Sequence, residues 1–388
     1  MAITPAAAIE AGLEQARKIA AMYADAETAL LKRIAARVGK DLDNDDGGDD
    51  WAAKRLSEVA QLRKEAESIV RRLESAAKAA AQAAVLDTWA EGMDAAVRGA
   101  MLQVADAKLR KRLERVLQDA KNLGTKRGIN AGQGVAELAA QSVRLITSVH
   151  EGALRAVDDI YREVIAETAG RVLTGSETRR EAAQRAIDRL TAQGITGFTD
   201  SASPPRTWSM TSYVEMAMRT ATARAAVDGH LSTLSEAGIN LVSVSRLPYT
   251  CDRCSRWEGK VLALSGAAGM RVEENLVTGV QTFVHVEGTV AEARLAGLLH
   301  PNCGHNLNAF LPGVSRPAPV VQATTTYADS QRSRYLERKV RESKRRAAVA
   351  LDDDTRRKAE QRVADYQQKA RQHAKATGLR RGRNRGAE

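Results

Sequence analysis

Apolar residues in the first half of the chain recur every three or four positions, the spacing that places side chains on one face of an α-helix. The first of these stripes covers residues 5–39, where Thr4 suits the N-cap and Pro5 suits the first helical position. Further stripes predict helices over residues 51–117, 135–173 and 177–193. Residues 1–194 are therefore expected to form a domain of long helices, arranged either as a bundle or as extended hairpins.

Two polar segments interrupt this helical pattern. The acidic sequence DLDNDDGGDD at residues 41–50 predicts a solvated loop that caps the helices, since it lacks the turn glycine and the bidentate glutamate of a calcium loop. The sequence NLGTKRGINAGQG at residues 122–134 is rich in glycine and predicts a second loop. It does not end in the Gly-Lys-Ser/Thr of a phosphate loop, so it predicts no nucleotide site.

The pattern changes after residue 194. A turn-like segment at 198–206 is followed by a helical stripe over 207–238. Short runs of apolar and β-branched residues then predict strands at residues 240–246, 261–264 and 281–286. Residues 195–315 are therefore expected to form a small α+β domain.

A linker and a charged tail complete the chain. Prolines and a glycine cluster between positions 312 and 319, which predicts a linker over residues 316–326. Residues 327–388 are expected to form a tail of two charged helices with a basic end. The predicted fold class is mainly α, with long N-terminal helices, a small α+β domain and a charged helical C-terminal tail.

The formal net charge of +11 resides in this tail. Residues 331–388 contain 19 Lys and Arg against 8 Asp and Glu, so their excess equals that of the whole chain. Such a tail attracts phosphates, including those of double-stranded DNA, or an acidic protein surface. The alternative interpretation is a solvated helical tail that its charges keep soluble.

Composition also excludes several classes of protein. No stretch approaches the roughly 18 consecutive apolar residues of a transmembrane helix, and residues 1–30 lack the pattern of a signal peptide, so no membrane association is expected. Aromatic residues make up only 4% of the chain, which favours thin layers of alanine-packed helices. Three cysteines in such a chain indicate a metal site rather than a disulfide framework.

All three cysteines lie in two motifs of equal spacing. Cys251 and Cys254 form a CxxC, and His300 and Cys303 form an HxxC that is followed by His305. A two-residue spacer lets two side chains of one tight turn reach one ion, and zinc takes four such ligands in a tetrahedron. We therefore predict a zinc knuckle with Cys251, Cys254, His300 and Cys303 as ligands, and with His305 as an alternate ligand or as a group beside the ligands. The alternatives are a reduced, buried cysteine pair and a redox CxxC.

The predicted zinc is structural rather than catalytic. Four protein ligands leave no coordination position for water. The nearby Glu258 and Glu273 lack the helical arrangement of a zinc hydrolase, and His285 with Glu287 matches only half of the deaminase pattern. No catalytic residue is predicted, and metal binding would add folding free energy to the small α+β domain.

Five segments between residues 194 and 313 carry a recognisable pattern: GITGFTD at 194–200, RTWSMTSYVEMAMRT at 206–220, AGINLVSVSRLPYTCDRCSRWEGKVLALSG at 237–266, HPNCGH at 300–305 and LPG at 311–313. In these segments the chain resembles the phage minor capsid protein family of the minor capsid protein 2 type, which is related to the phage Mu F-like head morphogenesis proteins. In the family the second motif usually has Arg before its last His, where this chain has Gly304.

The resemblance implies a non-enzymatic virion protein, present in few copies per head and involved in head morphogenesis and DNA packaging. It would lie inside the capsid near the portal vertex, with the portal protein and the capsid as partners, after assembly in the host cytoplasm. Residues 331–388 add double-stranded DNA as a candidate partner. The competing hypotheses are a zinc-containing nucleic-acid-binding protein that uses the basic tail, and a zinc hydrolase or nuclease. The sequence does not specify an oligomeric state.

Overall fold

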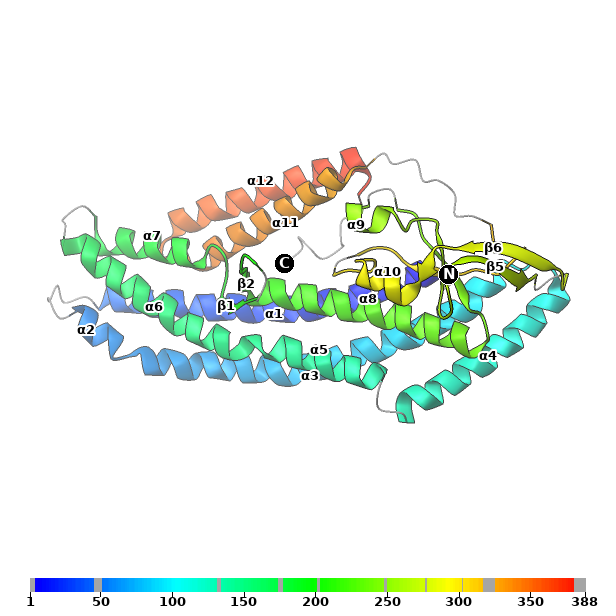
Figure 1. The fold of residues 1–388 in the computed structure, drawn as a ribbon. Coiled ribbons are helices and arrows are strands. Elements are labelled where there is room, and N and C mark those ends of the chain that lie inside the picture. Colours follow the sequence, from blue (N-terminus) through cyan, green and yellow to red (C-terminus); the bar gives the residue numbers. More distant parts are fainter. Residues whose placement is uncertain are drawn as a thin grey trace. The chain divides into compact units, whose positions relative to one another are not determined.

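The computed structural model describes residues 4–44, 51–130, 134–173, 177–200, 203–247, 250–275, 278–301, 303–316 and 325–379. The helices are α1 (Pro5–Asp43), α2 (Trp51–Leu56), α3 (Val59–Met101), α4 (Ala107–Asn130), α5 (Val135–Thr147), α6 (Val149–Leu173), α7 (Arg179–Thr191), α8 (Met210–Glu236), α9 (Asp252–Ser255), α10 (Val290–Leu295), α11 (Tyr327–Ala348) and α12 (Asp353–Thr377). The strands are β1 (Thr196–Thr199), β2 (Thr207–Ser209), β3 (Leu241–Val244), β4 (Val261–Ala263), β5 (Gly269–Glu274), β6 (Gln281–Val286), β7 (Gly288–Thr289) and β8 (Leu307–Ala309). Figure 1 shows how helices dominate, which confirms the predicted fold class. Among the described helices, none combines the length and the apolar composition needed to cross a membrane.

The long helical stripes form helices, with breaks that a stripe alone does not reveal. The run predicted from residue 51 is divided into α2, α3 and α4, with a turn at 102–106. Within this turn Val104 is buried, and its carbonyl accepts hydrogen bonds of 2.7 and 3.0 Å from the Arg110 guanidinium. The Asp106 carboxylate accepts a backbone N–H of the first turn of α4 over 2.7 Å, which caps that helix.

The prediction of a glycine-rich loop at residues 122–134 is wrong over most of this range, because α4 continues to Asn130. A glycine inside a helix costs only about 1 kcal/mol relative to alanine, and the leucine, lysine and arginine residues around it favour the helix. Residues 131–133 lie outside the described residues.

The acidic segment at residues 41–50 was expected to be solvated, and its first residue corrects that expectation. Asp41 lies inside α1 with only 1% of its surface exposed. Its carboxylate accepts a 2.5 Å hydrogen bond from the Tyr161 hydroxyl, and its backbone carbonyl accepts a 3.3 Å hydrogen bond from the Trp51 indole. Residues 45–50 lie outside the described residues.

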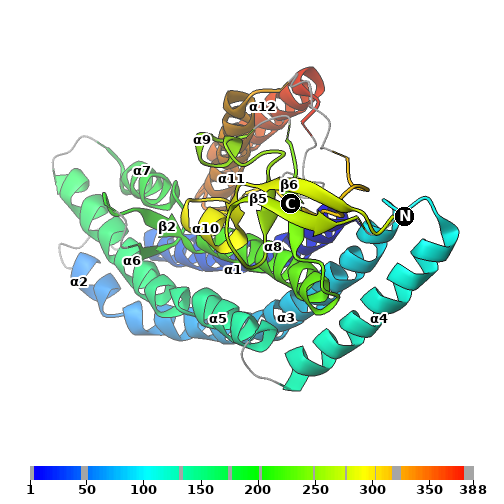
Figure 2. The same ribbon diagram turned by 45° about the vertical axis from the view of Figure 1, so that its right-hand side comes forward.

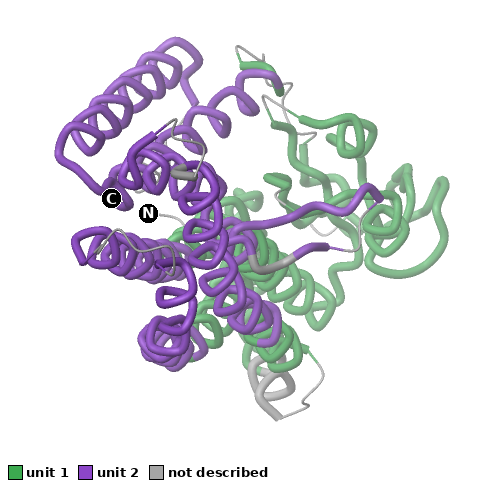
Figure 3. The backbone as a smooth tube through the Cα atoms, turned by 90° about the vertical axis from the view of Figure 1, so that its left-hand side faces the viewer, with its two compact units in different colours: residues 1–18, 79–143, 216–327 green, residues 19–78, 144–215, 328–388 purple. Residues whose placement is uncertain are grey.

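Two compact units, coloured separately in Figure 3, are each assembled from three stretches of the chain. Unit 1 comprises Met1–Lys18, Ala79–Val143 and Met216–Tyr327, and unit 2 comprises Ile19–Lys78, Arg144–Glu215 and Ala328–Glu388. The division predicted from the sequence, with boundaries after residues 194, 315 and 326, follows composition and linkers rather than contacts. The predicted boundaries therefore remain a prediction about segments of the sequence and not about the two compact units.

A four-stranded sheet in unit 1 has the order β7–β4–β3–β8, with β4 and β7 parallel and the other neighbours antiparallel. Alternate residues of a strand face opposite sides, and the two sides of this sheet are covered differently. Val242 and Val244 pack on the side of α3 and α8, in one hydrophobic core with residues of these two helices. Leu241 packs on the other side against Val284 and Val286 of the β5–β6 hairpin, which Figure 2 shows in yellow.

Unit 2 is built from helices and the two-stranded β1–β2 sheet. Part of the predicted tail belongs to it, since α11 buries Leu336 and Val340. The Arg345 guanidinium of α11 donates a 2.7 Å hydrogen bond to the Ala192 carbonyl and lies 3.7 Å from the buried Glu27 carboxylate. The interpretation of a tail that is solvated throughout therefore does not hold for α11.

Candidate metal centre

The two cysteine motifs fold into turns of the same shape. Cys251 is the N-cap of the short helix α9, and the Cys254 N–H donates a 3.0 Å hydrogen bond to the Cys251 carbonyl. In the second motif the Cys303 N–H donates a 2.9 Å hydrogen bond to the His300 carbonyl. Each turn is thus closed between its first and fourth residues, which brings those two side chains close together.

Strands β3 and β8 bring the two turns to the same place. They pair antiparallel with Val244 opposite Leu307, and the pairing continues beyond the strands. The Ser245 N–H donates to the Asn306 carbonyl over 3.0 Å, and the Asn306 N–H donates to the Ser245 hydroxyl over 3.0 Å. The CxxC turn follows β3 and the HxxC turn precedes β8, so two motifs that are distant in sequence meet at one end of a strand pair.

The backbone bends sharply just before His300. Gly297 and Leu299 have φ angles of 99° and 59°, in the left-handed region that a leucine rarely adopts. Leu298 between them is buried, and the Gly297 carbonyl lies 3.9 Å from the Cys254 sulfur. Strained backbone of this kind persists where the surrounding structure holds it, and here it positions the second motif.

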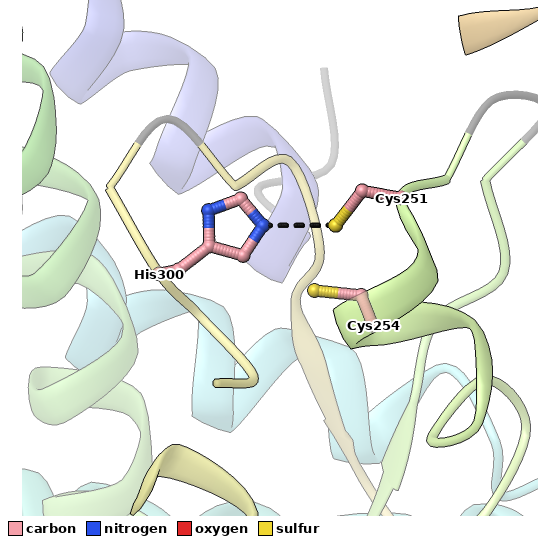
Figure 4. Close-up of side chains that lie close together, drawn as sticks. All are labelled: Cys251, Cys254 and His300. Carbon is pink, nitrogen blue, oxygen red and sulfur yellow. Dashed lines mark hydrogen bonds between the residues drawn. The ribbon is translucent and has the colours of Figure 1, made fainter. Parts of the chain in front are cut away.

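The five cysteine and histidine side chains form two overlapping groups. One contains Cys251, Cys254 and His300, the other contains Cys254, Cys303 and His305, and the ligand atoms of each group lie within 4.8 Å of one another. Cys251 Sγ is 3.1 Å from His300 Nε2, and Cys254 Sγ is 3.7 Å from Cys303 Sγ. Figure 4 shows Cys251 and Cys254 reaching from α9 toward His300 on the opposite loop. Cys254 joins the two groups.

The donor set and its spacing fit a tetrahedral metal ion. Thiolates bind zinc at about 2.3 Å, so two of them in a tetrahedron lie about 3.8 Å apart. The 3.7 Å separation of the Cys254 and Cys303 sulfurs matches that value. Cys254 is buried, while Cys251 and Cys303 are half-buried. The cluster could therefore hold a metal ion, with three thiols and an imidazole as donors.

His300 presents the nitrogen that a metal requires. Its Nδ1 lies 2.8 Å from the Pro301 carbonyl oxygen, which can only accept a hydrogen bond. The proton therefore belongs on Nδ1, and the lone pair of Nε2 is directed at the Cys251 side of the cluster. Metal-binding histidines commonly donate their other N–H to a carbonyl or a carboxylate in this way.

The His305 ring is buried and has a polar contact at each of its two nitrogens. It is 3% exposed, and its Nε2 lies 2.8 Å from a Glu258 carboxylate oxygen that also accepts the Leu247 N–H over 2.9 Å. Its Nδ1 lies 3.3 Å from Cys303 Sγ. Burial lowers the pKa of His305, but its contacts with Cys303 and Glu258 outweigh that effect and raise the pKa overall.

Hydrogen bonds inside the cluster separate the pKa values of the thiols. Contacts with Cys254 and then His305 lower the pKa of Cys303 to about 4, although burial opposes them. The hydrogen bond between Cys254 and Cys303, together with the burial of Cys254, raises the pKa of Cys254. Burial also acts to raise the pKa of Cys251, but hydrogen bonds involving His300 and Cys254 lower it overall. Cys251 and Cys303 thus favour the thiolate form that binds metal ions.

The other candidate acid–base residues lie outside the cluster. His285 is exposed on β6, and Glu287 forms a 3.1 Å ion pair with Lys260. Glu273 forms a 3.0 Å ion pair with Arg271 on β5. Sequence reasoning considered Glu258 only as a base and did not foresee its contact with His305. In the sequence, Glu258 is marked only by its position four residues after Cys254. That position does not show where the second motif lies in the folded chain.

Comparison with known proteins concerns the whole chain rather than the cysteine and histidine cluster alone. The sequence model of the family described as Phage minor capsid protein 2 matches residues 12–375. This range contains both cysteine motifs, and it extends far beyond residues 194–313, on which the resemblance was based. No curated protein and no solved structure matches the chain. Because the family match covers nearly the whole sequence, the chain belongs to the phage minor capsid protein 2 family.

Proposed function

We propose that this protein is a non-enzymatic structural component of the phage head, present in few copies and bound near the portal vertex inside the capsid. In this proposal it assembles in the host cytoplasm, contacts the portal protein and the capsid, and takes part in DNA packaging. Family membership supports a structural role in the virion. The long helices suit a protein that offers extended surfaces to its neighbours.

The cysteine and histidine cluster supports one structural zinc ion per chain. We assign Cys251, Cys254, His300 and Cys303 as ligands, because the Pro301 carbonyl fixes the tautomer of His300 that leaves Nε2 free to coordinate. A fixed set of four protein ligands joins the two turns and adds free energy of folding when zinc binds. His305 then hydrogen-bonds the Cys303 sulfur.

The hydrogen bonds of Glu258 favour a role in holding His305 over that of a general base. Glu258 is 13% exposed at its side chain, and one of its oxygens already accepts hydrogen bonds from His305 and from the Leu247 N–H. A general base needs a free oxygen within reach of a metal-bound water. In cobalt-substituted protein, an absorption spectrum that changes when anions are added would reveal an open coordination position and favour the hydrolase hypothesis.

Zinc content and thermal unfolding of the purified full chain test the proposed ligands. Wild type should bind one zinc ion per chain, and Cys251→Ser and His300→Ala should lose it together with several °C of thermal stability. The matched control is His285→Ala, which removes an exposed histidine of the same unit and should keep the metal. Zinc retained in His300→Ala but lost in His305→Ala would transfer the fourth ligand to His305.

The virion role has a separate test, namely the amount of the protein in purified heads. We expect co-purification at a few copies per head and cross-links to the portal protein. Recovery only from the soluble fraction of the host would contradict the proposed location.

DNA binding is a second candidate function, and the basic residues of the tail differ in the contacts that they make. Several basic residues of α11 make ion pairs within unit 2, as Arg341 does with Glu215 over 3.3 Å and Arg346 with Glu342 over 2.9 Å. The first turn of α12 pairs its basic residues with its own aspartates. In the described part of the chain beyond that turn, four basic residues of α12 are exposed and are the candidate phosphate contacts: Arg362, Lys369, Arg371 and Lys375.

Replacing these four residues with Gln should weaken binding to double-stranded DNA, because each neutralised phosphate contact releases counterions. The plot of log affinity against log salt should lose roughly 0.9 of slope for each contact removed. The matched control replaces four exposed basic residues of α4 with Gln: Lys108, Lys111, Arg112 and Arg115. Equal losses in both variants would indicate unspecific attraction, and unchanged binding in the α12 variant would exclude these four residues as phosphate contacts.

A further inference from the structure

Exposed apolar side chains concentrate on one hairpin of unit 1. Phe283, Met270 and Val272 expose 73%, 65% and 57% of their surface, and all three belong to the β5–β6 hairpin. Val280, at the turn that joins the strands, is 62% exposed. Scattered exposed apolar residues are ordinary, but a contiguous set on one element marks an interaction surface.

The strand register explains why these residues share a face. Val272 lies directly opposite Phe283, and Met270 lies opposite His285. The other face of the hairpin is covered, because Val284 and Val286 pack on the four-stranded sheet. The exposed face is thus the outer layer of unit 1 at this position.

The β5 strand also has an edge without a partner strand. In the described part of the chain β5 pairs only with β6. The Asn275 N–H donates to the Val280 carbonyl over 2.8 Å, so these two residues form a hydrogen-bonded pair. Such pairs alternate along an antiparallel ladder, so the N–H and C=O groups of Met270, Val272 and Glu274 point away from β6. Exposed edges of this kind are templates for pairing with another strand.

The sequence of β5 is self-complementary about its middle residue. In an antiparallel pairing of two copies centred on Val272, each Arg271 lies opposite Glu273 of the second copy. Arg271 and Glu273 occupy the face opposite Val272, where they already form a 3.0 Å ion pair within one chain. Opposite charges directly across a strand pair are stabilising, and like charges there are destabilising.

We propose that β5 pairs with β5 of a second copy of this chain, antiparallel and with the two-fold axis at Val272. The backbone groups that point away from β6 then complete their hydrogen bonds, with Val272 opposite Val272 and Met270 opposite Glu274 of the second copy. The inference goes beyond the proposed function and needs neither the metal nor the tail.

The same pairing joins the exposed apolar faces of the two copies into one surface. On the outer side, Phe283, Val272 and their two counterparts in the second copy form one continuous apolar row across four strands. On the inner side, two Arg271 and two Glu273 side chains alternate in charge. A partner strand of unrelated sequence would need apolar residues on its outer side and complementary charges on its inner side. A second copy of this chain supplies both by symmetry.

Sedimentation velocity of the full chain between about 1 and 100 µM tests the proposal. Wild type should form dimers with a Kd in the micromolar range or below. Arg271→Glu and Glu273→Arg should each weaken association about tenfold or more, because each places like charges opposite each other twice. An equimolar mixture of the two variants should recover association as a heterodimer, since two carboxylates of one chain then face two guanidinium groups of the other.

The mixture isolates the contact between chains from effects on folding. The ion pair within β5 is lost in both variants and stays lost after mixing, so recovery can arise only across two chains. Unchanged zinc content and thermal unfolding verify that each variant is folded. A wild type that stays monomeric, single variants that associate like wild type, or a mixture that stays monomeric would each overturn the proposal. If the wild type is monomeric, the free edge of β5 would instead be available for pairing with a strand of a different virion protein.

Discussion

His230 is buried within α8 with 1% of its surface exposed, and neither ring nitrogen has a hydrogen-bond partner in the described part of the chain. Burial in apolar surroundings disfavours the charged imidazolium and lowers the pKa of this residue to about 4. The side chain is therefore neutral in the folded protein near pH 7. Unpaired buried polar atoms cost free energy, so His230 weakens unit 1 rather than supporting it.

The pKa of His230 predicts a loss of stability in mild acid. Between about pH 6.5 and 4 the unfolded chain binds a proton at this residue and the folded chain does not, so unfolding becomes more favourable as the pH falls. The loss reaches about 3 kcal/mol for the full shift. His230→Leu should abolish this component and leave stability at pH 7 equal or higher. The difference between the urea unfolding curves of the two proteins across pH 4–7 measures it, and parallel pH profiles would refute the assignment.

At the scale of elements, glycines let two helices of unit 1 approach closely. A Cβ at Gly92 of α3 would overlap the Ala226 carbonyl of α8, and a Cβ at Gly229 of α8 would overlap the Trp89 carbonyl of α3. The two contacts are reciprocal, so each helix supplies both a glycine and a carbonyl. Helix propensity alone disfavours glycine in these positions, and the close crossing compensates for that cost.

Gly92→Ala should therefore destabilise the protein, by about 2 kcal/mol or more, because the helices must separate. The matched control is Gly39→Ala in α1, where an added Cβ meets no atom within 4 Å. That substitution should stabilise by about 0.5–1 kcal/mol through helix propensity. Chemical denaturation of both variants decides the matter, and a stabilising Gly92→Ala would show that the crossing is loose.

At the scale of the whole molecule, unit 2 joins early and late parts of the chain. Glu27 of α1 is 3% exposed, and its carboxylate accepts hydrogen bonds from the Ile195 N–H (3.0 Å) and the Thr211 hydroxyl (3.1 Å). Arg345 of α11 approaches it and supplies the compensating positive charge. A buried carboxylate without a cation is costly, so α1 and α11 depend on each other.

Arg345→Ala should destabilise unit 2 by about 3 kcal/mol, because it leaves the Glu27 carboxylate buried without its cation. Arg338→Ala, an exposed position of the same helix, should change stability by less than about 0.5 kcal/mol. Thermal unfolding of both variants measures the difference. Equal effects would mean that α11 is held by apolar contacts alone.

Local spacing was enough to predict the features that depend on neighbouring residues. Apolar stripes predicted the long helices, and the equal spacing of the CxxC and HxxC motifs predicted which side chains could share an ion. Both depend on interactions within a turn or two of backbone. The same local reasoning failed at residues 122–130, where the glycines lie inside a helix.

What the sequence by itself determined is the mainly helical class, the family resemblance and the composition of the cysteine and histidine cluster. The tertiary structure alone decided that Asp41 is buried, that α11 closes unit 2 and that Glu258 holds His305. It also decided that β5 has a free edge, within the described part of the chain, beside an exposed apolar face. The physical reason is that burial, ion pairing and strand edges depend on residues far apart in the chain, which come together only when it folds.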